Sequence, residues 1–203
     1  MKKNMRAFFQ KALSSNKIKL THDKSLSPAA VLVILYFTQN QYHIILNRRT
    51  DKVEHHKGEI SFPGGSKDQN DRDLLDTALR ETYEEMGVLI NDVEVLGKLN
   101  SVPTSSHFLI TPYVATIPNP YKFELNRAEV ESVIEVPITS LIEYDIQVNH
   151  NVTLNKTQIS NIRYSHEGNI IFGATARILN QFIYLIDRTS GKENLWPTVN
   201  LNQ

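Results

Sequence analysis

Three glutamates stand close together in residues 80–87, RETYEEMG. If this run is helical, Glu81 is three residues from Glu84 and four from Glu85, so the three carboxylates lie on one side of the helix. Like charges at these spacings repel one another, and a divalent cation that prefers oxygen ligands, such as Mg²⁺ or Mn²⁺, relieves the repulsion. The plainer interpretation is an acidic face in solvent, neutralised by Arg80 and salt, and for an isolated glutamate-rich helix it is the more frequent one.

A glycine turn precedes this run. Residues 62–65, FPGG, form a tight turn that lets main-chain groups approach a ligand closely. Together, the turn and the pattern R-E-x-x-E-E-x-G resemble the box of the Nudix hydrolase family, in which a glycine-rich loop and a helix hold the catalytic metal. The resemblance implies a Mg²⁺ or Mn²⁺ cofactor. Its implied ligands are Glu81 and Glu85 first, Glu84 third, and the Gly64 carbonyl.

The box has one departure from the family pattern. Asp71 stands where a glutamate is usual, and eight residues instead of seven separate it from Arg80. The insertion precedes the three glutamates and leaves their spacing intact. We expect Asp71 to cap the helix or to anchor Arg80, and Arg80 to pair with a carboxylate of the box.

Residues 48–65, RRTDKVEHHKGEISFPGG, narrow the resemblance. They are similar to the signature of the coenzyme A pyrophosphatase branch, R-S/T-x-x-L-x-x-H-x-G-E-I-x-F-P-G-G, with Val53 in place of leucine. Stretches at 96–99, 103–105, 111–112, 129–130, 135–137 and 173–176 extend the likeness over about residues 29–186, while Asn100 and Phe172 depart from it. The resemblance implies hydrolysis of the pyrophosphate linkage of coenzyme A or its derivatives, giving 3′,5′-adenosine bisphosphate and 4′-phosphopantetheine.

Basic side chains gather just before the turn, in a chain whose formal net charge is zero. Coenzyme A carries a diphosphate and a 3′-phosphate, and arginine binds phosphate through paired donors. Surface solvation is the alternative for each single residue, and we prefer it for Lys52 and His55. We expect the adjacent arginines to recognise the 3′-phosphate. The expected substrate-binding residues are Arg48, Arg49, His56, Gly64 and Gly65.

The expected reaction is attack of water on one phosphorus, with a metal that lowers the pKa of that water. Relatives commonly take the catalytic base from outside the box, and of the candidates Glu129 and Glu131 we prefer Glu129. We expect Glu59 to orient the glycine turn or pair with Arg80, in preference to a contact with metal-bound water. One alternative is a Nudix enzyme acting on ADP-ribose, a dinucleotide or an oxidised nucleotide. Another is a non-catalytic nucleotide sensor, against which the intact glutamates argue.

The surrounding pattern predicts the elements that position these residues. Apolar runs rich in β-branched residues predict strands at 29–37, 41–47, 60–62, 93–99, 109–117 and 130–136. Helices are expected at 72–86, ended by Gly87, and at 173–186. The order predicts an α/β (α+β) fold, a Nudix-like mixed β-sheet sandwiched between helices.

Three regions follow from this pattern. Residues 1–28 form a basic N-terminal segment, in which Met5, Phe8, Phe9 and Leu13 recur at helical spacing. We expect a capping helix in preference to a targeting peptide, because the segment has no apolar signal core. Residues 29–187 form the Nudix domain, and residues 188–203 form a polar C-terminal tail.

Composition excludes several classes of site. The chain has no cysteine, so disulfides, thiolate catalysis and cysteine-bound metals are ruled out. No run reaches the 18 or so apolar residues of a membrane span, and zero net charge argues against a nucleic-acid or membrane partner. We expect a cytoplasmic protein with a small-molecule nucleotide substrate, and leave a homodimer open.

Overall fold

The computed structural model describes residues 2–15, 25–52, 56–143, 152–154, 157–159 and 162–190. Strand β1 (Ser27–Thr38) lies in the middle of an eight-stranded mixed sheet. Its residues from Ala29 to Tyr36 are all buried, because helices cover both faces of the sheet. β7 (Phe108–Thr116) runs parallel to β1, and β2 (Gln41–Arg49) runs antiparallel to its second half.

The other strands of the sheet extend from these three. β5 (Glu94–Lys98) and β6 (Val102–Pro103) pair with β7, whereas β3 (Ile60–Ser61) and β8 (Val130–Pro137) pair with β2. Two separate hairpins follow, β9 (Val152–Leu154) with β10 (Thr157–Ile159), and β11 (Tyr164–His166) with β12 (Asn169–Ile171).

The sheet splits along one edge of β1. The short strand β4 (Gly64–Ser66) takes this edge at residues 29–31, and β2 takes it from Ile34 onward. Beyond that point β2 leaves β1 and pairs with β3 at Asn47 and Arg48, while its other edge pairs with β8 from His43 to Arg49. The glycine turn and the arginine-bearing end of β2 therefore face each other across the split.

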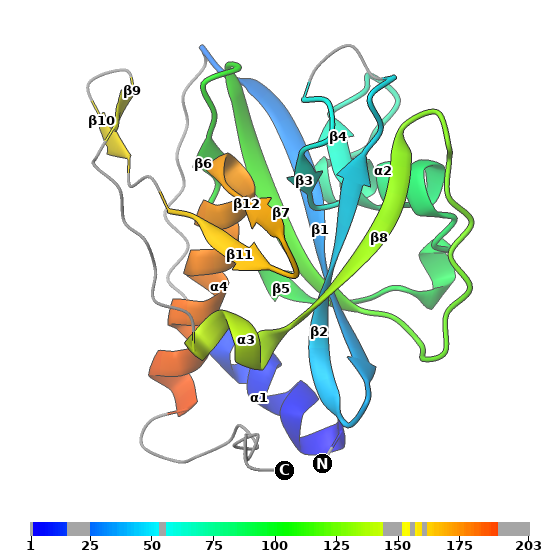
Figure 1. The fold of residues 1–203 in the computed structure, drawn as a ribbon, viewed down its shortest axis with the longest axis vertical. Coiled ribbons are helices and arrows are strands. Elements are labelled where there is room, and N and C mark those ends of the chain that lie inside the picture. Colours follow the sequence, from blue (N-terminus) through cyan, green and yellow to red (C-terminus); the bar gives the residue numbers. More distant parts are fainter. Residues whose placement is uncertain are drawn as a thin grey trace.

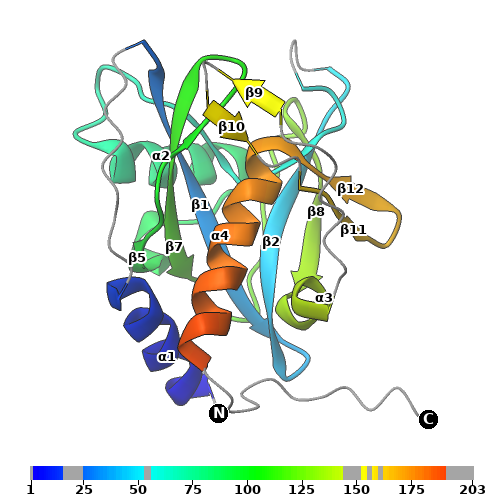
Figure 2. The ribbon, with the colours of Figure 1, turned by 90° about the vertical axis from the view of Figure 1, so that its left-hand side faces the viewer.

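Helices form a layer on each side of the sheet (Figures 1 and 2). On one side, α2 (Leu74–Met86) packs Ala78 and Met86 against the alternate β1 residues Leu32 and Ile34. On the other side, α1 (Lys2–Ser15) and α4 (Gly173–Ser190) lie against the opposite set, which includes Val33. The short helices α3 (Ile138–Glu143) and η1 (Ile90–Asp92) complete the described elements. The predicted mixed sheet between helices is confirmed.

Helix α1 is held by aromatic contacts. Phe9 is fully buried, with ring centroids 5.1 Å from Tyr42 and 5.9 Å from Phe182. Leu13 packs closely over Gly97 on β5. The N-terminal helix thus contributes to the same core as α4.

Several boundaries differ from the expected ones. The glycine turn itself forms β4, and α2 begins at Leu74 because Asp73 caps it. β6, α3 and the two hairpins were not predicted, and β8 includes Pro137 as its last residue. α4 continues to Ser190, so the first part of the expected tail is helical, and residues 191–203 lie outside the described part. Within that part, no helix is long and apolar enough to span a membrane.

Candidate active site

Helix α2 carries the three glutamates and is fixed at both ends. The Asp73 carboxylate accepts a hydrogen bond from the Asp76 amide at 2.9 Å, and Gly87 ends the helix in the left-handed conformation at φ 69°. The glutamates differ in environment because the helix presents them at different angles to the sheet. Glu85 is 3% exposed, whereas the Glu81 and Glu84 side chains are 19% and 51% exposed.

Glu85 lies in the split of the sheet, where three groups meet it. The Asn47 side-chain amide on β2 donates to Glu85 Oε2 at 2.9 Å, and the Gly64 backbone N–H donates to the same oxygen at 3.2 Å. Arg49 Nη1 lies 3.7 Å from the other oxygen, Oε1. Oε2 is thereby saturated, and Oε1 faces the arginine.

Burial makes the ionised forms of Glu81 and Glu85 less favourable. Burial raises the pKa of Glu85 to about 8, opposed by the Gly64 N–H and Arg49 and reinforced by the charges of Glu81 and Glu129. Burial also raises the pKa of Glu81, against the opposing charge of Arg80. A site that disfavours its own carboxylate charges gains stability from a cation.

Arg80 supplies part of the compensating charge. Its guanidinium contacts Asp71 at 2.8 Å, Glu84 at 2.9 Å and Glu81 at 3.0 Å. Hydrogen bonds from Arg80 hold the pKa of Asp71 well below its usual range. The expectation that Arg80 pairs with a box carboxylate is confirmed, and of the two roles expected for Asp71 it has that of the anchor, since Asp73 is the cap.

The Glu81 and Glu84 carboxylates both contact Arg80 Nη1, at 3.0 and 2.9 Å, whereas Glu85 is held in the split of the sheet by Asn47 and Gly64. The Glu84 side chain is half exposed. Among the described residues, no three acidic or histidine side chains already form a metal cage.

The two glycines of the turn have different roles. Gly64 has φ 147°, and a Cβ there would lie 2.3 Å from the Ala30 carbonyl oxygen. A Cβ on Gly65 would lie 2.5 Å from Cδ of Glu81. Gly64 therefore allows β4 to pair with β1, and Gly65 lets the Glu81 carboxylate approach the backbone.

The adjacent arginines point to opposite faces of β2. Arg49 shares the α2 face with Asn47, whereas Arg48 hydrogen-bonds to Asn169 on β12 and lies 4.0 Å from Glu131. The alternation of a strand separates neighbouring side chains in this way. The two arginines therefore do not form one cationic pair.

The loop between β2 and β3 is ordered by its own side chains. His56 has φ 58°, and its Nδ1 lies 2.9 Å from Glu59 Oε2. The Arg49 N–H donates to the Glu59 carbonyl at 3.0 Å. Glu59 thus pairs with His56. The expected alternative of an ion pair between Glu59 and Arg80 is not found among the described residues. Lys52 is exposed, and His55 lies outside the described residues.

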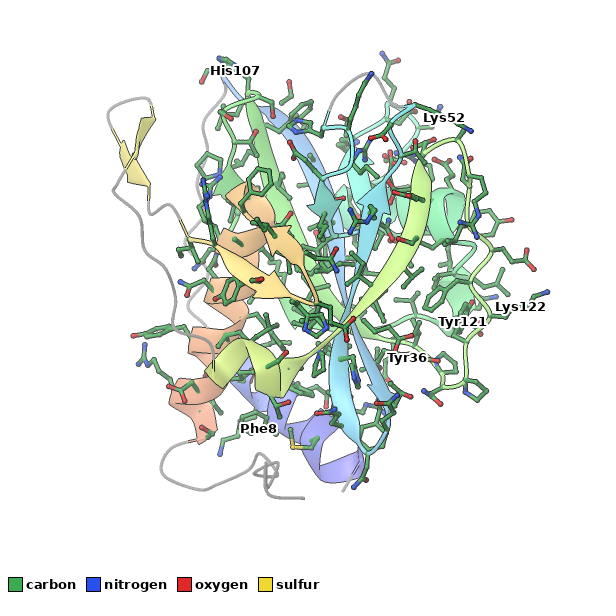
Figure 3. The ribbon with its side chains drawn as sticks, viewed as in Figure 1. Phe8, Tyr36, Lys52, His107, Tyr121 and Lys122 are labelled. Atoms are coloured by element: carbon green, nitrogen blue, oxygen red, sulfur yellow. The ribbon has the colours of Figure 1, made fainter. Side chains whose placement is uncertain are left out.

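Of the two candidate bases, Glu129 is the one whose charge influences the box glutamates. Its charge acts on both Glu81 and Glu85, and the preceding turn is tied to α2 because the Asn126 N–H donates to the Glu85 carbonyl at 3.0 Å. Glu131 is on the Arg48 side. Upstream, Tyr121 fixes the same segment by donating its N–H to the Tyr36 hydroxyl at 3.0 Å, while Lys122 points away (Figure 3).

Sequence reasoning missed Asn47. It is 1% exposed, and its Oδ1 has no hydrogen-bond partner in the described part of the chain. The available signal was the alternation of β2, since Asn47 is two residues from Arg49 and so shares its face.

Comparison with known proteins identifies the arrangement. A model described as the NUDIX domain matches residues 26–155. The chain belongs to the NUDIX domain family. It is 33% identical over 179 residues to a protein named "Uncharacterized Nudix hydrolase NudL" from Yersinia pestis (strain Pestoides F), covering 84% of this chain and 87% of the relative. A relative of the same name from Yersinia pseudotuberculosis serotype I (strain IP32953) matches with the same figures.

Solved structures of Nudix proteins share the fold. A MutT/nudix family protein from Enterococcus faecalis aligns with a TM-score of 0.54 at 18% identity, covering 92% of this chain and 75% of that one. The MutT protein from Methanosarcina mazei Go1 aligns with a TM-score of 0.53 at 14% identity, covering 85% and 100%. The protein is therefore a Nudix hydrolase, a pyrophosphatase by family.

Nudix hydrolases generally use a divalent ion such as Mg²⁺ or Mn²⁺, and the residues present fit one. The donor set consists of hard carboxylate and carbonyl oxygens, which these ions prefer. Burial raises the pKa values of two of the carboxyls, Glu81 and Glu85, and the charge of Glu129 adds to both shifts. A dication relieves this repulsion more fully than Arg80, which contacts two of the three box glutamates, Glu81 and Glu84, but not Glu85.

Proposed function

We propose that this Nudix hydrolase cleaves the pyrophosphate linkage of coenzyme A or its derivatives, giving 3′,5′-adenosine bisphosphate and 4′-phosphopantetheine. The observation that carries the proposal is the meeting of two parts of the chain at Glu85. Arg49 and Gly64, both positions of the coenzyme A signature, contact the carboxylate of the box helix. These contacts support a single site that combines the substrate signature with the metal-binding motif.

We assign the metal to Glu81 and Glu85, with Glu84 and the Gly64 carbonyl as further ligands. A bound Mg²⁺ or Mn²⁺ would neutralise phosphate oxygens and lower the pKa of water. Glu84 would reach the metal by leaving Arg80, a change open to it because the side chain is half exposed. Asn47 holds Glu85 through Oε2, so that Oε1 is the oxygen presented to the ligand.

The chain's own residues carry the remaining steps. Arg49 donates to oxygens of the diphosphate, and its Nε is buried without a partner among the described residues, which supports an anionic ligand there. Glu129 accepts the proton that the attacking water loses. The bond between phosphorus and the bridging oxygen breaks, and the leaving phosphate keeps the electron pair.

The remaining expected substrate-binding residues, His56, Gly65 and Arg48, have indirect support. His56 orders the loop that leads to the turn, and Gly65 gives Glu81 its position. Arg48 is engaged by Asn169 and Glu131, so we propose for it a role at the rim of the site. The cytoplasmic location, the homodimer and the lack of nucleic-acid or membrane partners stay predictions.

A hydrolysis assay with chromatographic separation of products tests the proposal. With Mg²⁺ or Mn²⁺, purified protein should convert coenzyme A to the two named products, and Arg49→Ala should slow the reaction. Glu81→Gln and Glu85→Gln should lower turnover by about 10²–10³. Glu124→Gln, whose parent side chain is 73% exposed, is the matched control and should keep normal turnover.

Two results would count against this function. Near-normal turnover of both variants at saturating Mg²⁺ would reject the metal ligands. Vigorous hydrolysis of ADP-ribose or a dinucleotide, with none of coenzyme A, would reject the substrate and leave the Nudix chemistry standing.

A further inference from the structure

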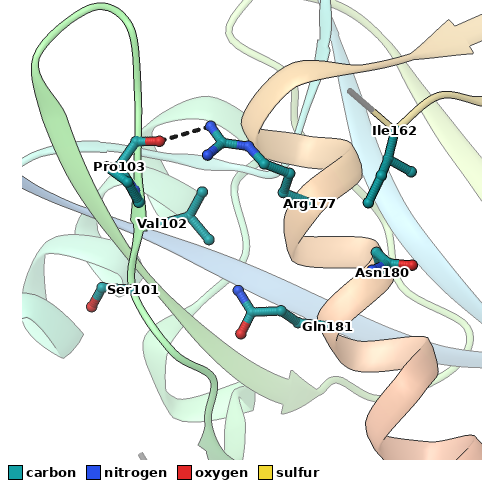
Figure 4. Close-up of a pocket in the computed structure, with 7 residues that line it drawn as sticks. All are labelled: Ser101, Val102, Pro103, Ile162, Arg177, Asn180 and Gln181. Atoms are coloured by element: carbon teal, nitrogen blue, oxygen red, sulfur yellow. Dashed lines mark hydrogen bonds between the residues drawn. The ribbon is translucent and has the colours of Figure 1, made fainter. Parts of the chain in front are cut away.

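A pocket of about 270 Å³ lies between β6 and the N-terminal half of α4. Figure 4 shows Arg177 reaching from the helix toward Pro103 on the strand, and Asn180 and Gln181 line the pocket further along α4. These three helix residues are spaced i, i+3 and i+4, so their side chains share one face. The pocket is on the side of the sheet opposite to α2.

The charge of Arg177 has no acidic partner among the described residues. Its guanidinium donates to two backbone carbonyls, those of Pro103 at 2.7 Å and Gly173 at 3.3 Å. A guanidinium has five N–H donors, so three remain for a ligand. Arg177 is only partly exposed, and this burial lowers its pKa.

The other polar groups of the pocket are neutral. Asn180 accepts a long hydrogen bond from Tyr164 at 3.4 Å through Oδ1, which leaves its Nδ2 as a donor. Gln181 donates to the Asn100 carbonyl at 3.3 Å with one of its two amide hydrogens, and Ser101 shares a hydrogen bond with Thr111. Among the described residues, no aspartate or glutamate lines the pocket.

We propose that this pocket binds a phosphate monoester, with the Arg177 guanidinium and the Asn180 amide as donors. A half-buried arginine with no acidic partner among the described residues fits an anion, and the planar guanidinium fits paired phosphate oxygens. The neutral amides can donate to the same group without repelling it. A carboxylate ligand would use fewer of these donors.

The sheet register sets the distance from the hydrolytic site. Val102 pairs with Ile110, Ile110 with Ala29, and Ala29 with Ser66 beside the glycine turn. Three strand spacings correspond to about 14 Å. A phosphate in the pocket is therefore not the reacting diphosphate, and belongs to a distal part of the substrate or to a separate ligand.

Direct binding of inorganic phosphate to the full-length protein, followed by ³¹P NMR line broadening, tests the pocket without reference to catalysis. Asn180→Asp is the sharper variant, because it keeps the size of the side chain and places an anion beside Arg177. It should weaken binding about tenfold or more while leaving the midpoint temperature unchanged or raised. Arg177→Gln should weaken binding similarly, and Arg72→Gln, at an exposed arginine, should not. Undiminished phosphate binding in both pocket variants would overturn the proposal and leave Arg177 only as a tie between β6 and α4.

A second measurement identifies the source of the phosphate, and this part rests on the proposed coenzyme A activity. If the pocket takes the 3′-phosphate, Asn180→Asp should lower kcat/KM for coenzyme A about tenfold or more and leave 3′-dephospho-coenzyme A unchanged. If Asn180→Asp loses phosphate binding but changes kcat/KM equally for both substrates, the pocket does not take the 3′-phosphate of coenzyme A. It would then be assigned to a separate phosphate ligand. If neither compound is hydrolysed, the proposed function fails, and the NMR result still decides the pocket.

Discussion

Asn47 on β2 donates its side-chain amide to Glu85 on α2 at 2.9 Å, across the split in the sheet. The bond joins two elements that sequence patterns treat separately, the strand before the glycine turn and the helix after it. Because Gly64 donates to the same carboxylate oxygen, the orientation of Glu85 is fixed from two directions. The acid at the centre of the site is therefore held in place at the cost of burial.

The burial of Glu85 predicts that the stability of the metal-free protein depends on pH. Glu85 has a pKa of about 8 when folded and an ordinary value of 4.5. Between pH 4.5 and about 8, Glu85 is ionised in the unfolded chain but still protonated in the folded protein. The free energy of unfolding therefore falls as pH rises from 4.5 to about 8, and this contribution is constant above that pH. Each unit of pKa difference corresponds to about 1.4 kcal/mol. Glu85→Gln should lack this loss and exceed wild type in stability at pH 9.

Urea unfolding in EDTA at pH 5, 7 and 9 measures the difference. Adding Mg²⁺ should reverse it, because the metal stabilises the ionised acid of the wild type. A stability difference between wild type and Glu85→Gln that stays constant with pH would show that Glu85 is ionised throughout.

Asp71→Asn should destabilise the protein through Arg80. Asp71 is only 5% exposed, because the side chains of Arg80 and Thr77 cover its carboxylate. We expect the midpoint temperature to fall by about 5–10 °C at pH 7, the effect of losing about 3 kcal/mol in a chain of this size. The pKa of Asp71 is depressed, so the stabilisation is complete above 3.8 and is lost as pH falls below it.

Arg72→Gln is the control for Asp71→Asn. Arg72 also forms an ion pair, with Asp76 at 2.6 Å, but its side chain is 85% exposed. No measurable change in the midpoint temperature is expected. Equal shifts for the two variants in differential scanning fluorimetry would contradict the special role of Asp71.

The two glycines of the turn should respond differently to a single added methyl group. Gly64→Ala should cost about 3 kcal/mol or more, because its Cβ meets the backbone of β1 at a φ that other residues avoid. Gly65→Ala should leave stability nearly unchanged and lower kcat by about 10²-fold, because its Cβ displaces the flexible Glu81 carboxylate. Unfolding curves and kinetics on both variants separate the effects, and loss of stability alone in Gly65→Ala would refute the assignment.

Phe9→Ala tests whether α1 is integral to the core. Removing a fully buried phenylalanine that contacts Tyr42 and Phe182 should cost about 3–5 kcal/mol, with an unchanged product pattern. Lys11→Ala, on the exposed side of the same helix, should have no measurable effect. A neutral Phe9→Ala in urea unfolding would mean that the helix is dispensable.

The sequence predicts the parts of the site that depend on local pattern. Spacing along one helix placed Glu81, Glu84 and Glu85 on α2, and the Arg80–Asp71 pair followed from the box. The main strands followed from runs of apolar residues, because burial on both faces requires them. The start of α2 shifted by two residues, from 72 to Leu74, because Asp73 caps the helix, while its end at Met86 is as expected.

The rest depends on contacts between distant residues. The burial of Glu85, the bond from Asn47 and the pairing of β4 with β1 all arise where the sheet splits, and no local pattern encodes a split. Arg48 and Arg49 looked equivalent as neighbours, yet strand alternation assigns them to opposite faces. Arg177 lay in a predicted helix, but its bond to the Pro103 carbonyl, in place of an acidic partner among the described residues, is visible only with β6 beside it.

The parallel pairing of β1 with β7 governs the order in which the protein can form during synthesis. β2 and β4 emerge soon after β1 and can pair with it at once, whereas Ser27 must wait for Phe108. Until then one long edge of a strand composed almost wholly of apolar residues has unpaired backbone groups, which is a template for aggregation. The whole of the glutamate helix is made during this interval. Truncated or stalled chains that end before β7 should therefore be insoluble, although they contain every proposed metal ligand.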